Sequence, residues 1–546
     1  MPTAPLERGA AAGQSADMIA EGAAETGAAS PALRWWERRW AVAALILLSA
    51  LPLLWPDVPP LLDLPGHMGR YAVQLHGHEP PLSDFYTFEW RLIGNLGIDL
   101  LVMPLAPIFG LELAVKLIVV AIPALTVAGF LWVAREVHGR IPPTAMLAVP
   151  FAYNFPFLFG FVNYALSMAL AFLAFGLWLR LARLQRTPLR AAIMVPLSIL
   201  LWICHAFGWG TLGVLAFSAE LVRQFDRGQG LVQAGLRAGL HCLSLAPPMI
   251  LMMLWRSEGS GGQTGDWLNF DAKLDWLRSA LRDRWEVFDT VSLALCCLVI
   301  FWAMVSRRIH FSRNLAASAL FLSIVFIVLP RIVFGSAYAD MRLAPYLFAV
   351  GLIAIRFPEG TGATFMKGLA LASLAFVLVR TGATTASMVL YDRSFDRELA
   401  ALEHVPRGAR MVSFIGRNCR EPWGMSRLLH LPGLAMVRNH AFSNDQWTMA
   451  GAQLLDVRYR KAWPFMRDPT QVVTPRPCGR EVWRSMNEAM AHFPRDAFDY
   501  VWTIDPPRFD PAFAEDLQPV WQNGRSRLYR VMRSPEDKVR RTPSAG

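Results

Sequence analysis

Residues 113–134 read LAVKLIVVAIPALTVAGFLWVA, an apolar run interrupted by one charged side chain, Lys116. A helix of this length is long enough to cross the roughly 30 Å hydrocarbon core of a bilayer. Apolar runs of about 15–22 residues recur between Trp40 and Leu390, whereas the last part of the chain has the mixed composition of soluble protein. Only 17% of the 546 residues are charged, against roughly 25% in soluble globular domains. The sequence therefore predicts an α-helical polytopic membrane protein with a C-terminal soluble part.

Short basic clusters between the apolar runs set the predicted orientation, because Lys and Arg accumulate in cytoplasmic loops. Residues 1–33, rich in Ala, Gly and Ser, are expected to form a disordered cytoplasmic tail ahead of arginines at positions 34, 38 and 39. The later basic loops alternate consistently with this start. Counting on this basis predicts about eleven transmembrane helices, at residues 40–56, 113–134, 144–159, 162–179, 191–205, 207–223, 235–255, 288–305, 314–330, 343–356 and 368–389.

The long first external loop is predicted at residues 57–112 of a transmembrane domain that spans residues 34–390. Its apolar stretch 92–110 would reverse the orientation of the next loop if it crossed the membrane, so we expect a juxtamembrane or re-entrant helix there. An odd number of spans places residues 391–546 outside the cytoplasm. Candidate strands and a helix-like stretch in this part predict a small extracytoplasmic α/β domain; they lie at residues 411–415, 480–492, 500–504 and 526–531.

The formal net charge of +11 is distributed in a way that indicates membrane topology. The basic residues form short clusters between apolar runs and no continuous basic face, so no nucleic-acid partner is predicted. The expected location is the inner, cytoplasmic membrane. Cys419 and Cys478 are the only cysteines in the soluble part, and in an oxidising compartment these two can form a disulfide.

The segment LLDLPGHMGRYAVQLHGHE, residues 61–79, places many ionisable side chains directly after the first predicted span. If a helix begins after Pro65, His67 and Arg70 lie three residues apart on one face, with Asp63 ahead of it. Asp63 and His67 are therefore candidate catalytic residues, and Arg70 is a candidate substrate-binding residue. An alternative is that Asp63 only caps the helix while the histidines are solvated.

Two further histidine patterns bear on possible ligands. His76 and His78 are spaced like metal ligands but lack a clear third one, so no metal is assigned and a divalent cation is left open. His205 ends an apolar run near the predicted external interface. An ionisable group at membrane depth usually faces a polar cavity, which makes His205 a candidate for substrate binding; the alternative is a single hydrogen bond to a neighbouring carbonyl.

The segment PRIVFGSAYADMRLAPY contains two arginines, Arg331 and Arg342, on the predicted outer side, against the positive-inside trend. Guanidinium groups bind phosphate bidentately, so both arginines and the intervening Tyr338 are candidates for binding an anionic headgroup. The alternative is that Arg342 pairs with Asp340 or with a carboxylate of the external loop.

A basic N-terminus, one span, a long external loop that opens with an acidic residue, and further spans before an extracytoplasmic α/β domain resemble the GT-C class of membrane glycosyltransferases. In that class an acidic residue of the first external loop acts as catalytic base or activates the acceptor, and Asp63 in LLDLPGH occupies the matching place. The segment YADMRLAPY, residues 338–346, resembles the arginine-containing segment ahead of a late span, which implies a phosphate-binding role for Arg342. The chain lacks the Asp–Glu pair of several such families and a WWD-like motif, which argues against asparagine-linked transfer.

These expectations lead to a predicted function. Nucleotide sugars are confined to the cytoplasm, so an outward-facing site needs a lipid-anchored donor. The chain is expected to move a sugar from a polyprenyl-phosphate donor to an extracytoplasmic glycan or lipid acceptor, with Asp63 as general base. The rival hypothesis is a non-enzymatic transporter or assembly factor for envelope glycans or lipids. Transporters tend to show repeats and ionisable residues at the midplane, and the sequence shows no such repeat.

Overall fold

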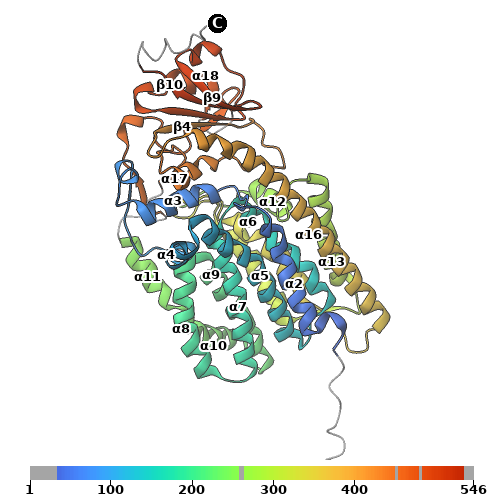
Figure 1. Cartoon of the computed structure of the whole chain (residues 1–546). Coiled ribbons are helices and arrows are strands. Elements are labelled where there is room, and N and C mark those ends of the chain that lie inside the picture. The colour runs from blue at the N-terminus through green and yellow to red at the C-terminus, as the bar shows by residue number, and fades with distance from the viewer. Residues whose placement is uncertain (1–32, 258–262, 449–452, 479–482, 534–546) are drawn as a thin grey trace, which may run out of the picture.

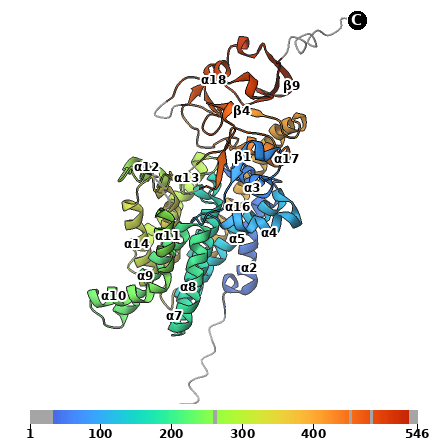
Figure 2. The ribbon, with the colours of Figure 1, turned by 90° about the vertical axis from the view of Figure 1, so that its left-hand side faces the viewer.

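A computed structural model describes residues 33–257, 263–448, 453–478 and 483–533, so the tail predicted at residues 1–33 lies almost wholly outside the described part. The described chain is mainly helical. Its helices form a bundle, and a sheet-containing C-terminal region lies at one end of that bundle, beyond α3, α12 and α17 (Leu64–His76, Phe270–Arg278 and Leu434–Arg438) (Figure 1). The view turned by 90° shows the same two parts (Figure 2).

Five helices of the described chain are long and apolar enough to cross a membrane, or six if a pair bent by 62° counts as one span. The five are α5 (Leu111–His138), α7 (Val162–Arg183), α8 (Thr187–Cys204), α13 (Glu286–Val305) and α16 (Ala363–Leu399). The bent pair joins α10 (Leu231–Cys242) and η4 (Leu243–Leu245) to α11 (Pro247–Ser257). The structure thus supports a helical membrane protein, while the predicted eleven spans are not confirmed.

The other apolar stretches of the described chain do not reach both the length and the hydropathy of a membrane span. Three are apolar helices too short to qualify alone: α2 (Arg39–Leu54), α14 (Arg313–Val328) and, in the predicted re-entrant stretch, α4 (Gly97–Phe109). The helices α9 (Ala206–Asp226) and α15 (Ala344–Ala354) pack against α14. The predicted span 144–159 is instead a buried 3-10 helix, η3 (Pro143–Tyr153), followed by α6 (Phe155–Phe159). Its prolines remove backbone donors, and such backbone is tolerated at depth when protein covers it.

The C-terminal region is built on a mixed six-stranded sheet with the strand order β7-β6-β4-β8-β10-β9. Strands β4, β6, β7 and β8 run parallel, whereas β10 pairs antiparallel with β8 and β9. Helix α18 (Met486–His492) packs against β4 and β6. The strands are β4 (Met411–Gly416), β6 (Val472–Thr474), β7 (Arg484–Ser485), β8 (Tyr500–Ile504), β9 (Leu517–Asn523) and β10 (Ser526–Val531). All three strands expected from the sequence are present.

The loop at residues 57–112, predicted to be external, and the C-terminal region are joined to each other. Strand β1 (Tyr86–Phe88) of the loop pairs antiparallel with β5 (Leu455–Val457). Helix α3 packs against α17 through glycines: a Cβ at Gly69 would lie 2.9 Å from the carbonyl oxygen of Gly433. A separate two-stranded ladder joins β2 (His310–Phe311) to β3 (Ile355–Arg356) elsewhere in the bundle. The loop and the C-terminal region therefore form one covering layer over one end of the bundle.

A sidedness experiment tests the orientation of this layer. A reporter fused after Arg186 or Arg308, in basic loops, should be active in the cytoplasm, and one fused after Gly546 should be active outside it. Paired alkaline phosphatase and fluorescent-protein fusions measure this. A cytoplasmic C-terminus would contradict the predicted topology and place the layer on the wrong side for a lipid-linked donor.

Candidate functional site

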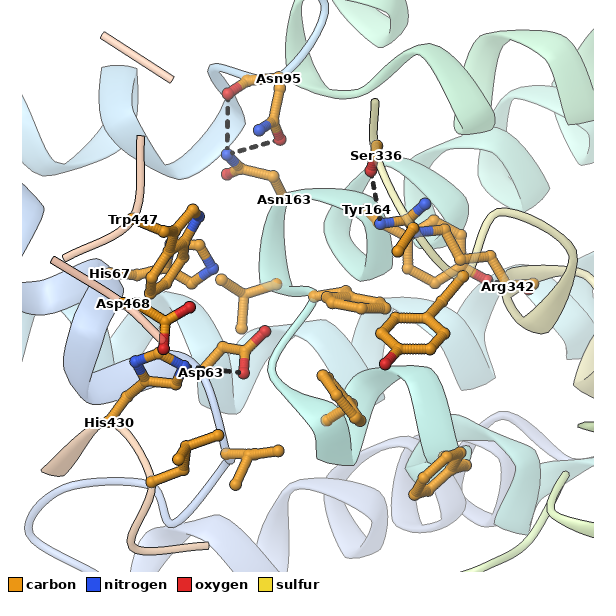
Figure 3. Close-up of a pocket in the computed structure, with 18 of the residues that line it drawn as sticks. Asp63, His67, Asn95, Asn163, Tyr164, Ser336, Arg342, His430, Trp447 and Asp468 are labelled. Carbon is orange, nitrogen blue, oxygen red and sulfur yellow. Dashed lines mark hydrogen bonds and ion pairs between the residues drawn. The ribbon is translucent and has the colours of Figure 1, made fainter. Parts of the chain in front are cut away.

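The covering layer and the ends of the bundle helices enclose a cavity of about 540 Å³. Side chains from the first external loop, from α7 and α9, from the segment before α15 and from the C-terminal region line it. Figure 3 shows polar side chains of this cavity, with Asn95 and Asn163 near the top of the view. Asp63 and its neighbours lie on one side, and Arg342 with Ser336 and Tyr164 lies on the other.

Asp63 is held in place by the turn that follows α6. Its backbone N–H donates to the carbonyl oxygen of Phe159 at 3.0 Å. Gly160 adopts φ = 103°, and a Cβ there would lie 2.6 Å from the Asp63 nitrogen, so the turn requires glycine on both grounds. Asp63 is the N-cap residue of α3, but its side chain makes no capping hydrogen bond. Capping of α3 is therefore not the role of the Asp63 carboxylate.

The neighbour of this carboxylate is His430, which the sequence reading did not select. The Nε2 atom of His430 lies 3.9 Å from Asp63 Oδ1 (Figure 3). Its Nδ1 atom lies 3.9 Å from Asp445 Oδ2. A signal for this residue exists in the sequence. Asp63 and His430 are each followed by Leu-Pro-Gly, and the two turns pack together, since a Cβ at Gly433 would lie 2.6 Å from the carbonyl oxygen of Pro65.

Burial and charge shift the pKa values of this pair in useful directions. Burial raises the pKa of Asp63 to about 7; His430 and Arg342 oppose that rise, while Asp468 adds to it. Burial disfavours the charged form of His430, but the carboxylates of Asp445, Asp63 and Asp468 outweigh it and raise its pKa to about 9. Near neutral pH a cationic imidazolium thus faces a carboxyl group that exchanges its proton easily.

His67 lies beside this pair. Its ring packs against Trp447, with ring centroids 5.2 Å apart. Burial, followed by the charges of Arg70 and His430, holds the pKa of His67 well below its usual range. His67 is therefore a neutral imidazole, and its Nδ1 atom is buried without a hydrogen-bond partner among the described residues.

Arg342 lies at the other side of the cavity and is 6% exposed. Its guanidinium group lies over Phe161, 4.4 Å from the ring centroid, and donates to Ser336 Oγ at 3.4 Å. No carboxylate of the described residues lies within ion-pair distance of it. The alternative partner Asp340 instead binds Lys273 at 3.2 Å, and Arg342 Nε has no hydrogen-bond partner among the described residues. A buried, unbalanced guanidinium of this kind is suited to bind an anion.

His205 and Tyr338 also line the cavity, as Arg342 does. The backbone N–H of Phe207 donates to His205 Nδ1 at 3.1 Å, so the proton of the neutral ring lies on Nε2, where it can be donated to a ligand. The hydroxyl group of Tyr164 donates to the carbonyl oxygen of Arg342 and holds its backbone. Five of the seven site residues chosen from the sequence thus meet in one cavity: Asp63, His67, His205, Tyr338 and Arg342.

The other two, Arg70 and Arg331, do not line this cavity. Arg70 is 1% exposed and forms a bidentate pair with Asp99, in which Nη2 lies 3.1 Å from Oδ2. Asn163 also donates to Asp99 at 3.0 Å, so this network joins α3 to α4 and α7. Arg331 pairs with Asp266 at 3.3 Å and is partly exposed. Both arginines already have carboxylate partners, which makes them poor phosphate ligands.

The described residues offer no metal site. Among residues 33–257, 263–448, 453–478 and 483–533, no group of three or more His, Cys, Asp or Glu side chains is placed to hold a metal ion. His76, from the predicted metal-like pair, stacks on His440 with ring centroids 5.5 Å apart. Cys419 and Cys478 do form the disulfide that the sequence suggested, with Cα atoms 5.3 Å apart.

Compared with protein-family models and with curated proteins, the chain matches none of them. The function is therefore argued from the cavity itself.

Proposed function

We propose that this protein is a membrane glycosyltransferase of the GT-C type, which moves a sugar from a polyprenyl-phosphate donor to an extracytoplasmic glycan or lipid acceptor. One observation carries the proposal. A single cavity at the end of the helical bundle contains a carboxyl group with a pKa of about 7, Asp63, and a buried arginine without a carboxylate partner among the described residues, Arg342. These are the two charges that such a transfer needs.

Arg342 would bind the phosphate of the donor. Its planar group offers parallel N–H donors to two phosphate oxygens, and burial strengthens this attraction because little water competes. His205 would add an Nε2 donor from the end of α8. The aromatic side chains that line the cavity, including Phe155, Phe159 and Trp276, provide apolar walls for an isoprenoid chain or a sugar ring.

Asp63 would act as the general base. The acceptor hydroxyl gives its proton to the Asp63 carboxylate while its oxygen forms a bond to the anomeric carbon of the donor sugar. The bond between that carbon and the phosphate oxygen breaks, and the polyprenyl phosphate leaves with the electron pair. Arg342 stabilises the charge that develops on the leaving phosphate. His430 would position Asp63 and hold its negative charge.

The non-enzymatic alternative accounts less well for Asp63. A transporter has a use for a phosphate-binding arginine, and a proton-coupled one also for a carboxyl group whose pKa is raised to about 7, but an assembly factor needs no such carboxyl group. Perturbed pKa values of this kind collect at catalytic sites. The cavity also lies at one end of the bundle, whereas transporter sites lie near the bilayer midplane.

The pH dependence of sugar transfer tests the proposal. Purified protein in nanodiscs should transfer labelled sugar from polyprenyl-phosphate donors, and kcat/KM should fall about tenfold per pH unit below pH 7, because protonated Asp63 accepts no proton. His430→Gln removes the positive charge that favours the Asp63 carboxylate. The pH below which kcat/KM falls should therefore move to a higher value.

The matched control is His492→Gln, which alters an exposed histidine of α18 outside the cavity and should leave the profile unchanged. A profile that is flat from pH 5 to pH 9 in the wild-type protein would show that no group with this pKa takes part.

A further inference from the structure

Several side chains of the C-terminal region also line the same cavity. Ile415 and Gly416 at the end of β4, Val472 at the start of β6, and Trp483 just before β7 all line it. Strands β4 and β6 are parallel neighbours. In open α/β sheets ligands bind beyond the carboxyl ends of the parallel strands, and the loops that follow β4 and β6 meet there.

These two loops are tied together at several points. The disulfide between Cys419 and Cys478 joins the loop after β4 to the loop after β6. The guanidinium group of Arg417 lies over the indole of Trp483, 4.5 Å from the ring centroid, and also pairs with Glu421 at 2.8 Å. We call this group, Arg417, Glu421, Trp483 and the disulfide, the Trp483 shelf.

The charge of the shelf differs from that of the Arg342 end. Arg417 is neutralised by Glu421, whereas Arg342 has no carboxylate partner among the described residues. A phosphate therefore favours the Arg342 end, since Arg282, which also lines the cavity, already donates to the carbonyl oxygens of Pro422 and Trp423. What the shelf offers is a partly exposed indole, one face of which lies against Arg417, with a donor side chain, Arg417, and an acceptor side chain, Glu421, beside it. A sugar ring, which has an apolar C–H face and a hydroxyl edge, matches that combination.

We propose that the Trp483 shelf is a saccharide subsite that binds an uncharged pyranose ring. Its place in the same cavity as Asp63 makes that ring part of the acceptor, and this last step rests on the proposed transferase function. In that arrangement the sugar ring stacks on the indole face opposite Arg417, and Arg417 and Glu421 contact its hydroxyl groups from the indole edge. The disulfide keeps the loops that carry these side chains at a fixed spacing.

The test uses the full chain in nanodiscs and saturation-transfer difference NMR. The probes are linear oligosaccharides of D-glucose, D-mannose, D-galactose and N-acetyl-D-glucosamine. At least one should receive saturation at its ring protons, and Trp483→Ala should weaken its binding about tenfold or more. Trp483→Phe keeps an aromatic face and should restore part of the binding. The control is Trp463→Ala, which removes an indole that is 66% exposed on the same domain and lies outside the cavity.

A second variant guards against a folding defect at Trp483. Replacing both Cys419 and Cys478 with Ser releases the loops and should weaken the same oligosaccharide without removing any side chain that contacts it. Equal binding by wild type, Trp483→Ala and the double serine variant would overturn the subsite, as would a wild-type protein that binds none of the probes. Asp63→Asn protein should still bind the oligosaccharide. If oligosaccharide binding depends on Trp483 but the wild-type protein transfers no sugar, the subsite proposal stands and the proposed transferase function is overturned.

Discussion

Protein that carries Asp63→Asn should insert and accumulate like wild type but transfer sugar about two to four orders of magnitude more slowly. Asparagine keeps the size of the side chain and removes the proton acceptor. The backbone contact of residue 63 with Phe159 is independent of the side chain, and no capping hydrogen bond is lost, since Asp63 makes none. Initial rates with a polyprenyl-phosphate sugar donor measure the effect.

The thermal stability of the Asp63→Asn protein should not fall with its transfer activity. Burial raises the pKa of Asp63 in the folded protein to about 7, from 3.8. For a group shifted upward in this way, the folded state is stabilised when the carboxyl is protonated, and that contribution is lost as pH rises towards 7. Asparagine carries no charge at any pH, so at pH 8 the variant should unfold at the same temperature as wild type or higher.

The matched control is Asp57→Asn, which makes the same change at an exposed position of the same loop, outside the cavity of Asp63. It should leave transfer unchanged. Near-normal transfer by the Asp63→Asn protein would overturn the proposed mechanism and favour the transporter or assembly-factor hypothesis.

The membrane helices were readable from the sequence wherever an apolar run was long and free of proline clusters. The runs that became α5, α7 and α8 are of that kind. The run at residues 144–159 is a 3-10 helix followed by a short α-helix, which its apolar composition alone does not predict. This segment is buried by other parts of the chain. Its amino-acid composition does not show which distant residues will pack around it.

The soluble domain was also partly readable. The strands β4, β8 and β10 were anticipated from short runs of β-branched and aromatic residues. The pairing of β1 with β5 was not, because these strands lie at opposite ends of the chain and each is only three residues long. That pairing is what brings the C-terminal region over Asp63.

The site shows the same division between local and long-range information. Asp63 and Arg342 were selected because their local sequence is unusual for a membrane protein. Arg70 is a candidate for the same reason, but Asp99, 29 residues away, binds both of its Nη atoms. His430 was missed because it stands in the soluble domain, where a single histidine is unremarkable until its Leu-Pro-Gly turn is compared with the one after Asp63.

Arg342→Lys should be the second largest change, and it should act on the donor. Lysine keeps the positive charge but presents a point charge in place of a planar fork, and it loses the stacked contact with Phe161. Losing one charge-assisted hydrogen bond costs about 1.5–3 kcal/mol, which corresponds to roughly 10- to 100-fold in kcat/KM for the donor. Separate titrations of donor and acceptor should assign the loss to the donor.

Arg331→Lys is the matched control for Arg342→Lys, because Arg331 lies in the same external segment, is paired with Asp266 and does not line the cavity. It should change donor kinetics little, since an exposed ion pair tolerates lysine. If the two lysine variants lose equal activity, the effect belongs to the fold of that segment. A large loss confined to Arg342→Lys places the donor phosphate at the buried Arg342 guanidinium, which no carboxylate of the described residues balances within ion-pair distance. Arg282 also lines the cavity, but it is only half-buried and donates to the carbonyl oxygens of Pro422 and Trp423.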